Sequence, residues 1–189
     1  MFLAHRPGTR EIEEFIKESQ SLTLSYAQVG LAKRAPSDFR IDEAFGVIGR
    51  GNTAFEQAKL ALREWRHFEL GWVERFPENA SIEAGTTVAV LIHHFGLWSL
   101  NGCRVVYEVG RLEENRFGFA YGTLTNHAEM GEEVFQVSIS AESEEVSYNI
   151  RAASKPRAAL ARIGYPITRM LQARFRRDSI TAMQRAVIS

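Results

Sequence analysis

Apolar residues near the start of the chain recur every three or four positions. Between residues 9 and 20 they form a single stripe, and Thr9 is a suitable cap, so the pattern predicts an amphipathic helix. Residues 21–38 contain turn-forming residues and show little periodicity. We expect this second segment to form a loop that packs on the surface of the protein.

The period of the pattern changes further along the chain. Residues 42–49 predict a strand, and the next apolar positions predict a helix that begins at Asn52 or Thr53 and extends to about Trp65. Beyond it the helical period disappears, and segments rich in Val, Ile, Phe and Tyr alternate with short clusters of Gly, Asn or Glu. The strands expected there cover residues 71–76, 86–95, 102–109, 115–125, 132–140 and 145–153. Because their links are short, successive strands should pair in antiparallel fashion.

The chain closes with a helical pattern. Pro156 suits the first turn of a short helix, and Pro166 suits the start of a long one that extends to about Val187. Arg169 and Arg176 fall on one side of the long helix. The opposite, apolar arc contains Ile167, Leu171, Phe175, Ala182 and Ala186.

This order of one strand, one helix, six strands and a long helix predicts an α+β fold. A curved antiparallel sheet of about seven strands has one face to bury, and the long C-terminal helix is available to cover it. The arrangement is that of the helix-grip fold, which often keeps a cavity between helix and sheet. We expect residues 39–189 to form this domain, and residues 1–38 to add an N-terminal helix and loop that pack on it.

Composition supports a globular protein and excludes several classes. Of the 189 residues, 45% are hydrophobic and 24% are charged, which suits a packed core. The 23 basic residues balance the 23 acidic ones, so net charge gives no reason to expect a nucleic-acid partner. A single cysteine excludes a disulfide framework and a multi-cysteine metal site. No apolar run has the length of a membrane span or a signal peptide, so we expect a cytoplasmic protein without a cofactor.

Basic residues are concentrated at the C-terminal end. Residues 151–189 contain nine Arg or Lys and one acidic residue, Asp178. One interpretation is a solvated helix face that pairs with the more acidic body. The other is a surface for anionic lipid or nucleic acid. The arginines of such a surface would be Arg162, Arg169, Arg176 and Arg177.

Residues 117–124, Phe-Gly-Phe-Ala-Tyr-Gly-Thr-Leu, are the most unusual segment. In a strand the larger side chains, including Tyr121, lie on one face, and Gly118, Ala120 and Gly122 lie on the other. A row of small residues weakens a strand, so something must approach that face closely. The interpretations that stay open are a packed helix, a strongly bent strand and a ligand.

Glu133 shares a strand face with the apolar residues Phe135 and Val137, whereas Glu132 should point to the opposite face. A carboxylate on the core side must be paired or have a raised pKa. If that face opens onto a cavity, Glu133 is a candidate acid, base or ligand anchor. The alternative is that Glu133 lies in water at the frayed start of its strand.

The histidines give weaker indications. His93 and His94 are adjacent in a strand and face opposite sides, so they cannot bind one metal ion together, and we expect no metal site. His127 lies in the turn before the two glutamates. The residues that we expect to line the cavity are Tyr121, Glu133, Tyr148, Arg169 and His127.

The segment Gly49-x-Gly51-x-x-Ala54 matches the dinucleotide-binding fingerprint. That fingerprint belongs to alternating strand and helix units with a parallel sheet, which the six following strands contradict. We therefore interpret the segment as a tight turn before a helix.

Several motifs together resemble one family. They are Tyr26-x-x-Val-Gly30, Gly49-x-Gly51, the block from Phe119 to Leu124, His127, Gly131-Glu-Glu133, Ser154-x-Pro156 and Arg169-x-Leu171-Gln172. Over about residues 20–187 the chain resembles the DUF1990 family, a domain of unknown function. It departs from the family pattern at Thr125-Asn126, where Pro-Gly is expected. The resemblance implies a fold similar to the START and birch-allergen-like superfamily, and no established activity.

These observations support two main classes of function. The first is a binding protein that holds a small, mostly apolar molecule in the cavity. The second is an enzyme acting on such a molecule, with Glu133 or His127 as acid or base. A third hypothesis is a peripheral membrane or scaffold protein that uses the basic C-terminal helix. We favour the binding protein, with a small apolar molecule as its partner.

Overall fold

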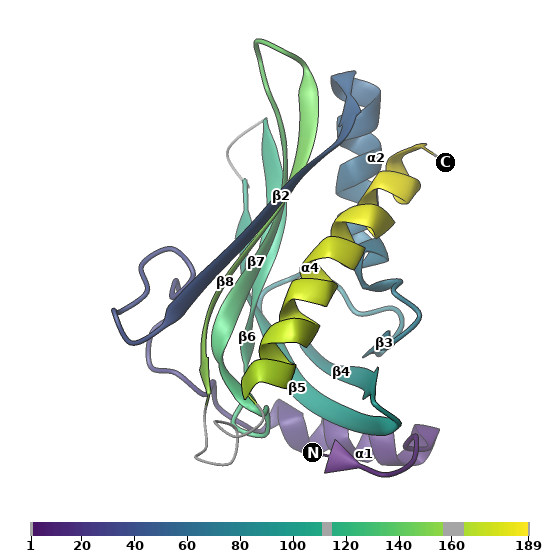
Figure 1. Ribbon diagram of the computed structural model, residues 1–189, viewed down its shortest axis with the longest axis vertical. Helices are drawn as coiled ribbons and strands as arrows, with labels where there is room; N and C mark the ends of the chain where they lie inside the picture. The colour runs from purple at the N-terminus through teal and green to yellow at the C-terminus, as the bar shows by residue number, and fades with distance from the viewer. Residues whose placement is uncertain (1, 111–114, 157–164, 189) are drawn as a thin grey trace.

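The computed structural model describes residues 2–110, 115–156 and 165–188 (Figure 1). One sheet runs in the order β2-β8-β7-β6-β5-β4-β3, with β1 paired to β5, and every pairing is antiparallel. The strands are β1 (Phe2–Leu3), β2 (Arg40–Arg50), β3 (Val73–Phe76), β4 (Thr87–His94), β5 (Leu97–Val109), β6 (Arg116–Thr123), β7 (Glu129–Ile139) and β8 (Glu145–Pro156). The helices are α1 (Thr9–Gln20), α2 (Gly51–Arg63), the 3-10 turn η1 (Arg66–Phe68) and α4 (Tyr165–Ile188). The predicted helix-grip fold of the α+β class is confirmed.

Helix α4 lies across one face of the curved sheet, beside α2 (Figure 1). The side chains that it turns inward recur every four residues: Leu171, Phe175, Ser179, Met183 and Val187. The predicted arc is right for Leu171, Phe175 and Ala186, which pack against the core, whereas Ala182 does not belong to this cluster. Helix α4 contacts α2 as well as β2.

The main core fills the space between this face of the sheet and the helices. Trp65, Phe119 and Phe135 are fully buried there, and the ring centroids of Trp65 and Phe119 are 4.5 Å apart. Tyr121 belongs to the same cluster, so the larger side chains of β6 share one face as predicted.

The opposite face of the sheet is covered by residues 22–39, which we call the strap. Tyr26 of the strap is buried against this face together with Ala120 of β6, and a Cβ at Gly122 would overlap the Tyr26 hydroxyl. At Gly118 it is the backbone of β7 that comes close, as in a bent strand. The small residues of β6 therefore make room for an extended segment, and the expectation of a helix or a ligand on this face is wrong.

Two helix starts differ from the predicted ones. Gly8, rather than Thr9, is the cap of α1, and its backbone N–H donates to the Glu11 carboxylate at 2.7 Å. Helix α2 begins at Gly51, directly after β2 and before the polar residues expected as its cap. Gly51 has a φ of +80°, which glycine adopts without strain, so the turn needs no polar cap.

Strand ends differ because the sheet extends the pairing beyond the predicted boundaries. Strand β7 begins at Glu129, three residues before the predicted start, and β8 continues to Pro156, which pairs with Glu129. Pro156 therefore ends a strand instead of starting a short helix. The remainder of that predicted helix, residues 157–164, lies outside the described residues.

Candidate functional site

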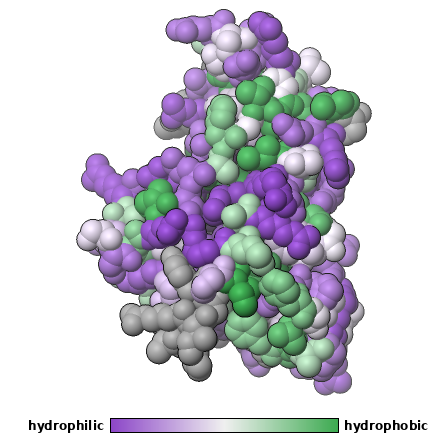
Figure 2. All heavy atoms as spheres, in the orientation of Figure 1, coloured by the Kyte–Doolittle hydropathy of each residue, from purple (hydrophilic) through white to green (hydrophobic). Residues whose placement is uncertain are grey.

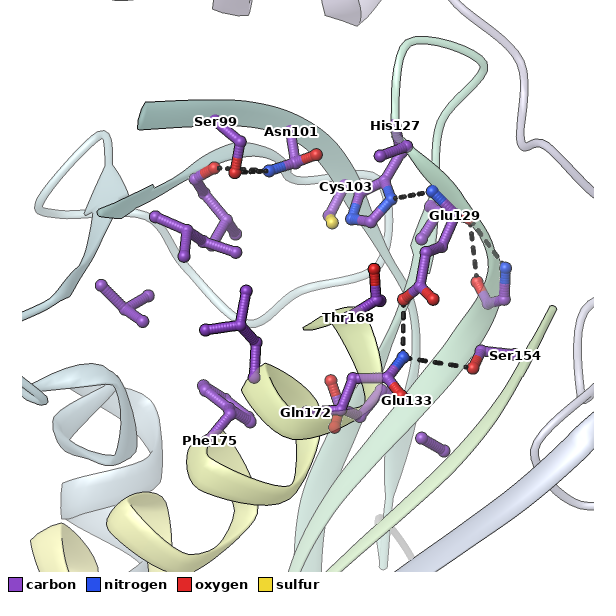
Figure 3. A pocket seen from close by; sticks show the side chains of 18 of the residues that line it. Ser99, Asn101, Cys103, His127, Glu129, Glu133, Ser154, Thr168, Gln172 and Phe175 are labelled. Carbon is purple, nitrogen blue, oxygen red and sulfur yellow. Dashed lines mark hydrogen bonds between the residues drawn. The ribbon is translucent and has the colours of Figure 1, made fainter. Parts of the chain in front are cut away.

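A cavity of about 500 Å³ lies between the sheet and the first half of α4 (Figure 3). Its apolar lining includes Phe68, Trp72, Val90, Ile92, Leu171 and Phe175. Its polar lining includes His127, Glu129, Glu133, Ser154 and Gln172, which lie together on one side of the cavity (Figure 3). The cavity thus has an apolar wall and a polar end, and its volume is in the range of small-molecule sites.

Glu133 lies in the middle of β7, opposite Tyr121 on β6 and Ala152 on β8. This position contradicts a frayed, solvated strand end. The Tyr121 hydroxyl donates to the Glu133 carboxylate at 2.9 Å. Burial raises the pKa of Glu133 to about 7, although the Tyr121 hydrogen bond and the Arg176 charge act in the opposite direction. Glu133 therefore gains and loses its proton near neutral pH.

Glu129 is a second carboxylate at the polar end, and it lies outside the strand predicted for residues 132–140. The Gln172 amide donates to Glu129 at 2.6 Å and to the Ser154 hydroxyl at 3.4 Å. Burial raises the pKa of Glu129, and the hydrogen bond from Gln172 opposes this effect. Glu129 is four residues before Glu133, so alternation would have placed both on one face had the strand been extended to residue 129.

Three of the five predicted lining residues, Tyr121, Glu133 and His127, line the cavity. The backbone N–H of Glu129 donates to His127 Nδ1 at 2.9 Å, which leaves the ring proton on Nε2. Tyr148 is instead fully buried beneath α4, where its hydroxyl and that of Ser179 are 3.0 Å apart. The prediction that Tyr148 lines the cavity is therefore wrong.

Arg169 is likewise absent from the cavity lining, because it holds α4 against β2. Both of its terminal nitrogens donate to Asp42, and Arg176 lies 3.6 Å from the same carboxylate. The exposed fractions of the side chains are 10% for Asp42, 18% for Arg169 and 12% for Arg176. Burial acts to raise the pKa of Asp42, but the hydrogen bonds from Arg169 and the charge of Arg176 outweigh it and hold the pKa below its usual value.

This arrangement corrects the interpretation of the basic helix as a surface for lipid or nucleic acid. Arg169 and Arg176 face the sheet rather than solvent. Arg177 is exposed and pairs with Asp178, while Arg162 lies outside the described residues. Among the described residues, no helix is long and apolar enough to cross a bilayer.

One side of the cavity is bordered by exposed apolar residues. Phe2 and Ile167 both line it, and their exposed fractions are 66% and 48%. Figure 2 shows apolar surface gathered in the lower half of the view, where α4 begins in Figure 1. An apolar molecule would therefore meet apolar surface before it enters the cavity.

Glu132 is a buried carboxylate that serves the opposite face of the sheet. It accepts hydrogen bonds from the hydroxyls of Tyr26 and Tyr107 and from the backbone N–H groups of Gly30 and Ala32, at 2.9–3.1 Å. The predicted orientation of Glu132, away from Glu133, is confirmed. Three of its four donors lie in the strap, and they were not predicted because the residues of the strap carry no periodic signal.

The side chains that line the cavity can bind a ligand and transfer protons. Cys103 lines it, but burial raises the pKa of the thiol, so the thiol stays protonated. Within residues 2–110, 115–156 and 165–188, no three His, Cys, Asp or Glu side chains are grouped so as to hold a metal ion. The site offers apolar space, the carboxylates of Glu129 and Glu133, the guanidinium group of Arg176 and neutral polar groups.

Comparison with known proteins identifies the family. The model of the domain of unknown function DUF1990 matches residues 25–182. The chain belongs to the DUF1990 family. A UPF0548 protein of Dictyostelium discoideum is 31% identical, with 99% of this chain and 96% of the relative covered. A UPF0548 protein of Deinococcus radiodurans is 33% identical, with 98% of each chain covered.

Solved structures share the fold of this DUF1990 protein at low sequence identity. A hypothetical protein of Helicobacter pylori aligns with a TM-score of 0.54 and 11% identity, covering 86% of this chain and 96% of that one. Norcoclaurine synthase of Thalictrum aligns with a TM-score of 0.50 and 9% identity. The alignment covers 81% of this chain and 98% of the synthase chain. At such identities the likeness concerns the fold alone.

Proposed function

We propose that this protein binds a small, mostly apolar molecule in the cavity between the sheet and α4, with the polar part of the molecule against Glu133. The observation that carries the proposal is the cavity itself, about 500 Å³ of space with aromatic and aliphatic walls and with Glu129, Glu133 and Gln172 on one side. Such a distribution orients a ligand by its polar group and gains affinity from its apolar body.

A cavity-filling substitution tests this proposal. Leu171→Trp places a larger side chain in the cavity, whereas Leu60→Trp makes the same change on the exposed surface of α2. The probe is N-phenyl-1-naphthylamine, an apolar dye whose fluorescence rises in apolar surroundings. We expect the dye to bind the wild-type protein and Leu60→Trp, and to bind Leu171→Trp at least about tenfold more weakly. Absence of dye binding to the wild type, or equal binding to Leu171→Trp, would contradict the proposal.

The second candidate function is acid–base catalysis on the bound molecule by Glu133. It is favoured by the pKa of about 7, which suits a group that both accepts and donates a proton at neutral pH. His127 is the alternative acid or base, since it lines the same polar end. Norcoclaurine synthase shares the fold, so the fold itself does not separate enzymes from binding proteins.

Native mass spectrometry separates these two functions. A molecule that co-purifies with the protein would be extracted and incubated with fresh wild-type protein and with Glu133→Gln. A binding protein returns the molecule with unchanged mass in both cases. An enzyme using Glu133 changes the molecule in the wild-type sample only.

A further inference from the structure

The arginines near the polar end of the cavity are already paired with a carboxylate of the protein, and one of them, Arg176, also lines the cavity. Arg169 donates to both oxygens of Asp42, and Arg176 lies 3.6 Å from the same carboxylate. All three side chains are at most 18% exposed. A ligand with a negative group would therefore have to compete with Asp42 for these arginines.

The carboxylates that line the cavity are held by neutral groups instead. Glu133 accepts a hydrogen bond from the Tyr121 hydroxyl, and Glu129 accepts one from the Gln172 amide. In each case the bond goes to one oxygen, and among the described residues the second oxygen of either carboxylate accepts none. Both carboxylates therefore have an acceptor left for a ligand.

The salt bridges at this end give the same direction. The three guanidinium groups here, those of Arg40, Arg169 and Arg176, all pair with Asp42. Among the described residues, neither Glu129 nor Glu133 forms a salt bridge. Burial raises the pKa of both cavity glutamates, and the charges of Arg176 on Glu133 and of Arg169 on Glu129 offset this rise only in part.

We propose that the molecule held in this cavity carries a protonated amine, whose ammonium group binds Glu133 and Glu129 while its apolar part lies between Trp72 and Phe175. This inference rests on the proposed binding function and adds the class of ligand. An ammonium group has three donors and no acceptor, which suits two carboxylates that each have an oxygen without a hydrogen bond. An alcohol offers a single neutral donor, and a carboxylate would meet like charge.

Three eight-carbon probes that differ only in their polar group test the inference. Octylamine, 1-octanol and octanoate would be titrated into the protein by calorimetry at about pH 8, where Glu133 is ionised and the amine is still protonated. We expect octylamine to bind about tenfold more tightly than octanol, and octanoate to bind most weakly. Glu133→Gln should reduce octylamine affinity about tenfold and leave octanol affinity unchanged.

Matched variants make the outcomes distinct. Glu142→Gln makes the same change at an exposed position and should bind all three probes like the wild type. Glu129→Gln should also lower the ratio of octylamine affinity to octanol affinity. If Glu133→Gln no longer binds octanol, the test relies on Glu129→Gln instead. Equal affinity of octylamine and octanol for the wild type, or an unchanged ratio in the variants, overturns the inference while the proposed function stands. Failure of all three probes to bind overturns both.

Discussion

Glu132 and Glu133 are neighbours in β7, and the alternation of the strand gives them different surroundings. The Glu132 carboxylate accepts four hydrogen bonds from tyrosines and backbone groups on the strap side of the sheet. Glu133 accepts one, from Tyr121, and lines the cavity. A slip of one residue in the pairing of β7 would exchange the two carboxylates, so their separation depends on the register of the sheet.

His67 is a second residue whose chemistry comes from its surroundings. It is fully buried between the rings of Trp65, Phe119 and Phe135, and among the described residues neither of its ring nitrogens has a hydrogen-bond partner. Burial lowers the pKa of His67 well below its usual value, with a smaller contribution from the charge of Arg75. The folded protein therefore holds this histidine neutral.

We predict that His67→Phe reduces the loss of stability in acid. Below about pH 6.5 the unfolded chain binds a proton at His67 that the folded protein does not, so stability falls as the pH falls. Between about pH 8 and pH 5 this one group accounts for up to about 2 kcal/mol of lost stability. Urea unfolding of His67→Phe at both pH values should show a correspondingly smaller difference. His5→Phe, at an exposed position, should behave like the wild type, and equal acid sensitivity of all three proteins would contradict the prediction.

At the scale of elements, the strap needs Glu132 because it has no regular structure of its own along most of its length. Two of the four donors to Glu132 are backbone N–H groups of the strap, at Gly30 and Ala32. In a buried segment without a helix or a ladder, backbone groups must find such partners elsewhere. The strap pairs with the end of β6 at Leu24 and Ser25, and the Glu132 carboxylate provides partners further along, at Gly30 and Ala32.

We predict that Glu132→Gln loosens the strap. The amide keeps one acceptor oxygen but turns an NH₂ group toward two donors, which should lower the free energy of unfolding by about 3 kcal/mol. Amide hydrogen exchange at Gly30 and Ala32 and limited proteolysis within residues 22–39 should both become faster. Glu133→Gln, the same change on the other face of the strand, is the matched control and should leave the strap protected. Faster exchange in both variants would instead indicate general destabilisation of β7.

At the scale of the whole molecule, the position of α4 determines whether the cavity exists. Three features fix it against β2: the Asp42 pairs with Arg169 and Arg176, the close contact between Gly46 and Ile180, and the hydrogen bond from the Gln184 amide to the Val47 carbonyl at 3.0 Å. A Cβ at Gly46 would overlap the Ile180 side chain, so the glycine allows the helix to approach the strand. The cavity lies toward the N-terminal end of α4, where the arginines rather than close packing hold the helix.

We predict that Asp42→Asn lowers the free energy of unfolding by about 3 kcal/mol, because it leaves two partly buried arginines without their carboxylate. Since the pKa of Asp42 is lowered in the folded state, this contribution is present at neutral pH and is lost as the pH falls below about 4. Chemical denaturation at neutral pH provides the measurement. The exposed pair of Arg10 and Glu14 is the control, and Glu14→Gln should have little effect. Equal effects of the two substitutions would show that the Asp42 cluster does not hold α4.

The sequence alone determined the order of the elements, the antiparallel sheet and the faces of its strands. These follow from local periodicity, which depends only on residues near one another in the chain, and they were enough to place Tyr121 and Glu133 on the cavity side. The family resemblance pointed to the same fold.

Only the tertiary structure decided which residues meet across the molecule. It brought Arg169 to Asp42 over 127 residues of chain, placed Tyr148 beneath α4 and covered the small residues of β6 with the strap. None of these contacts leaves a periodic signal, because each depends on where two distant elements pack. The strap is the plainest case, since its burial comes from the sheet it crosses rather than from any pattern of its own.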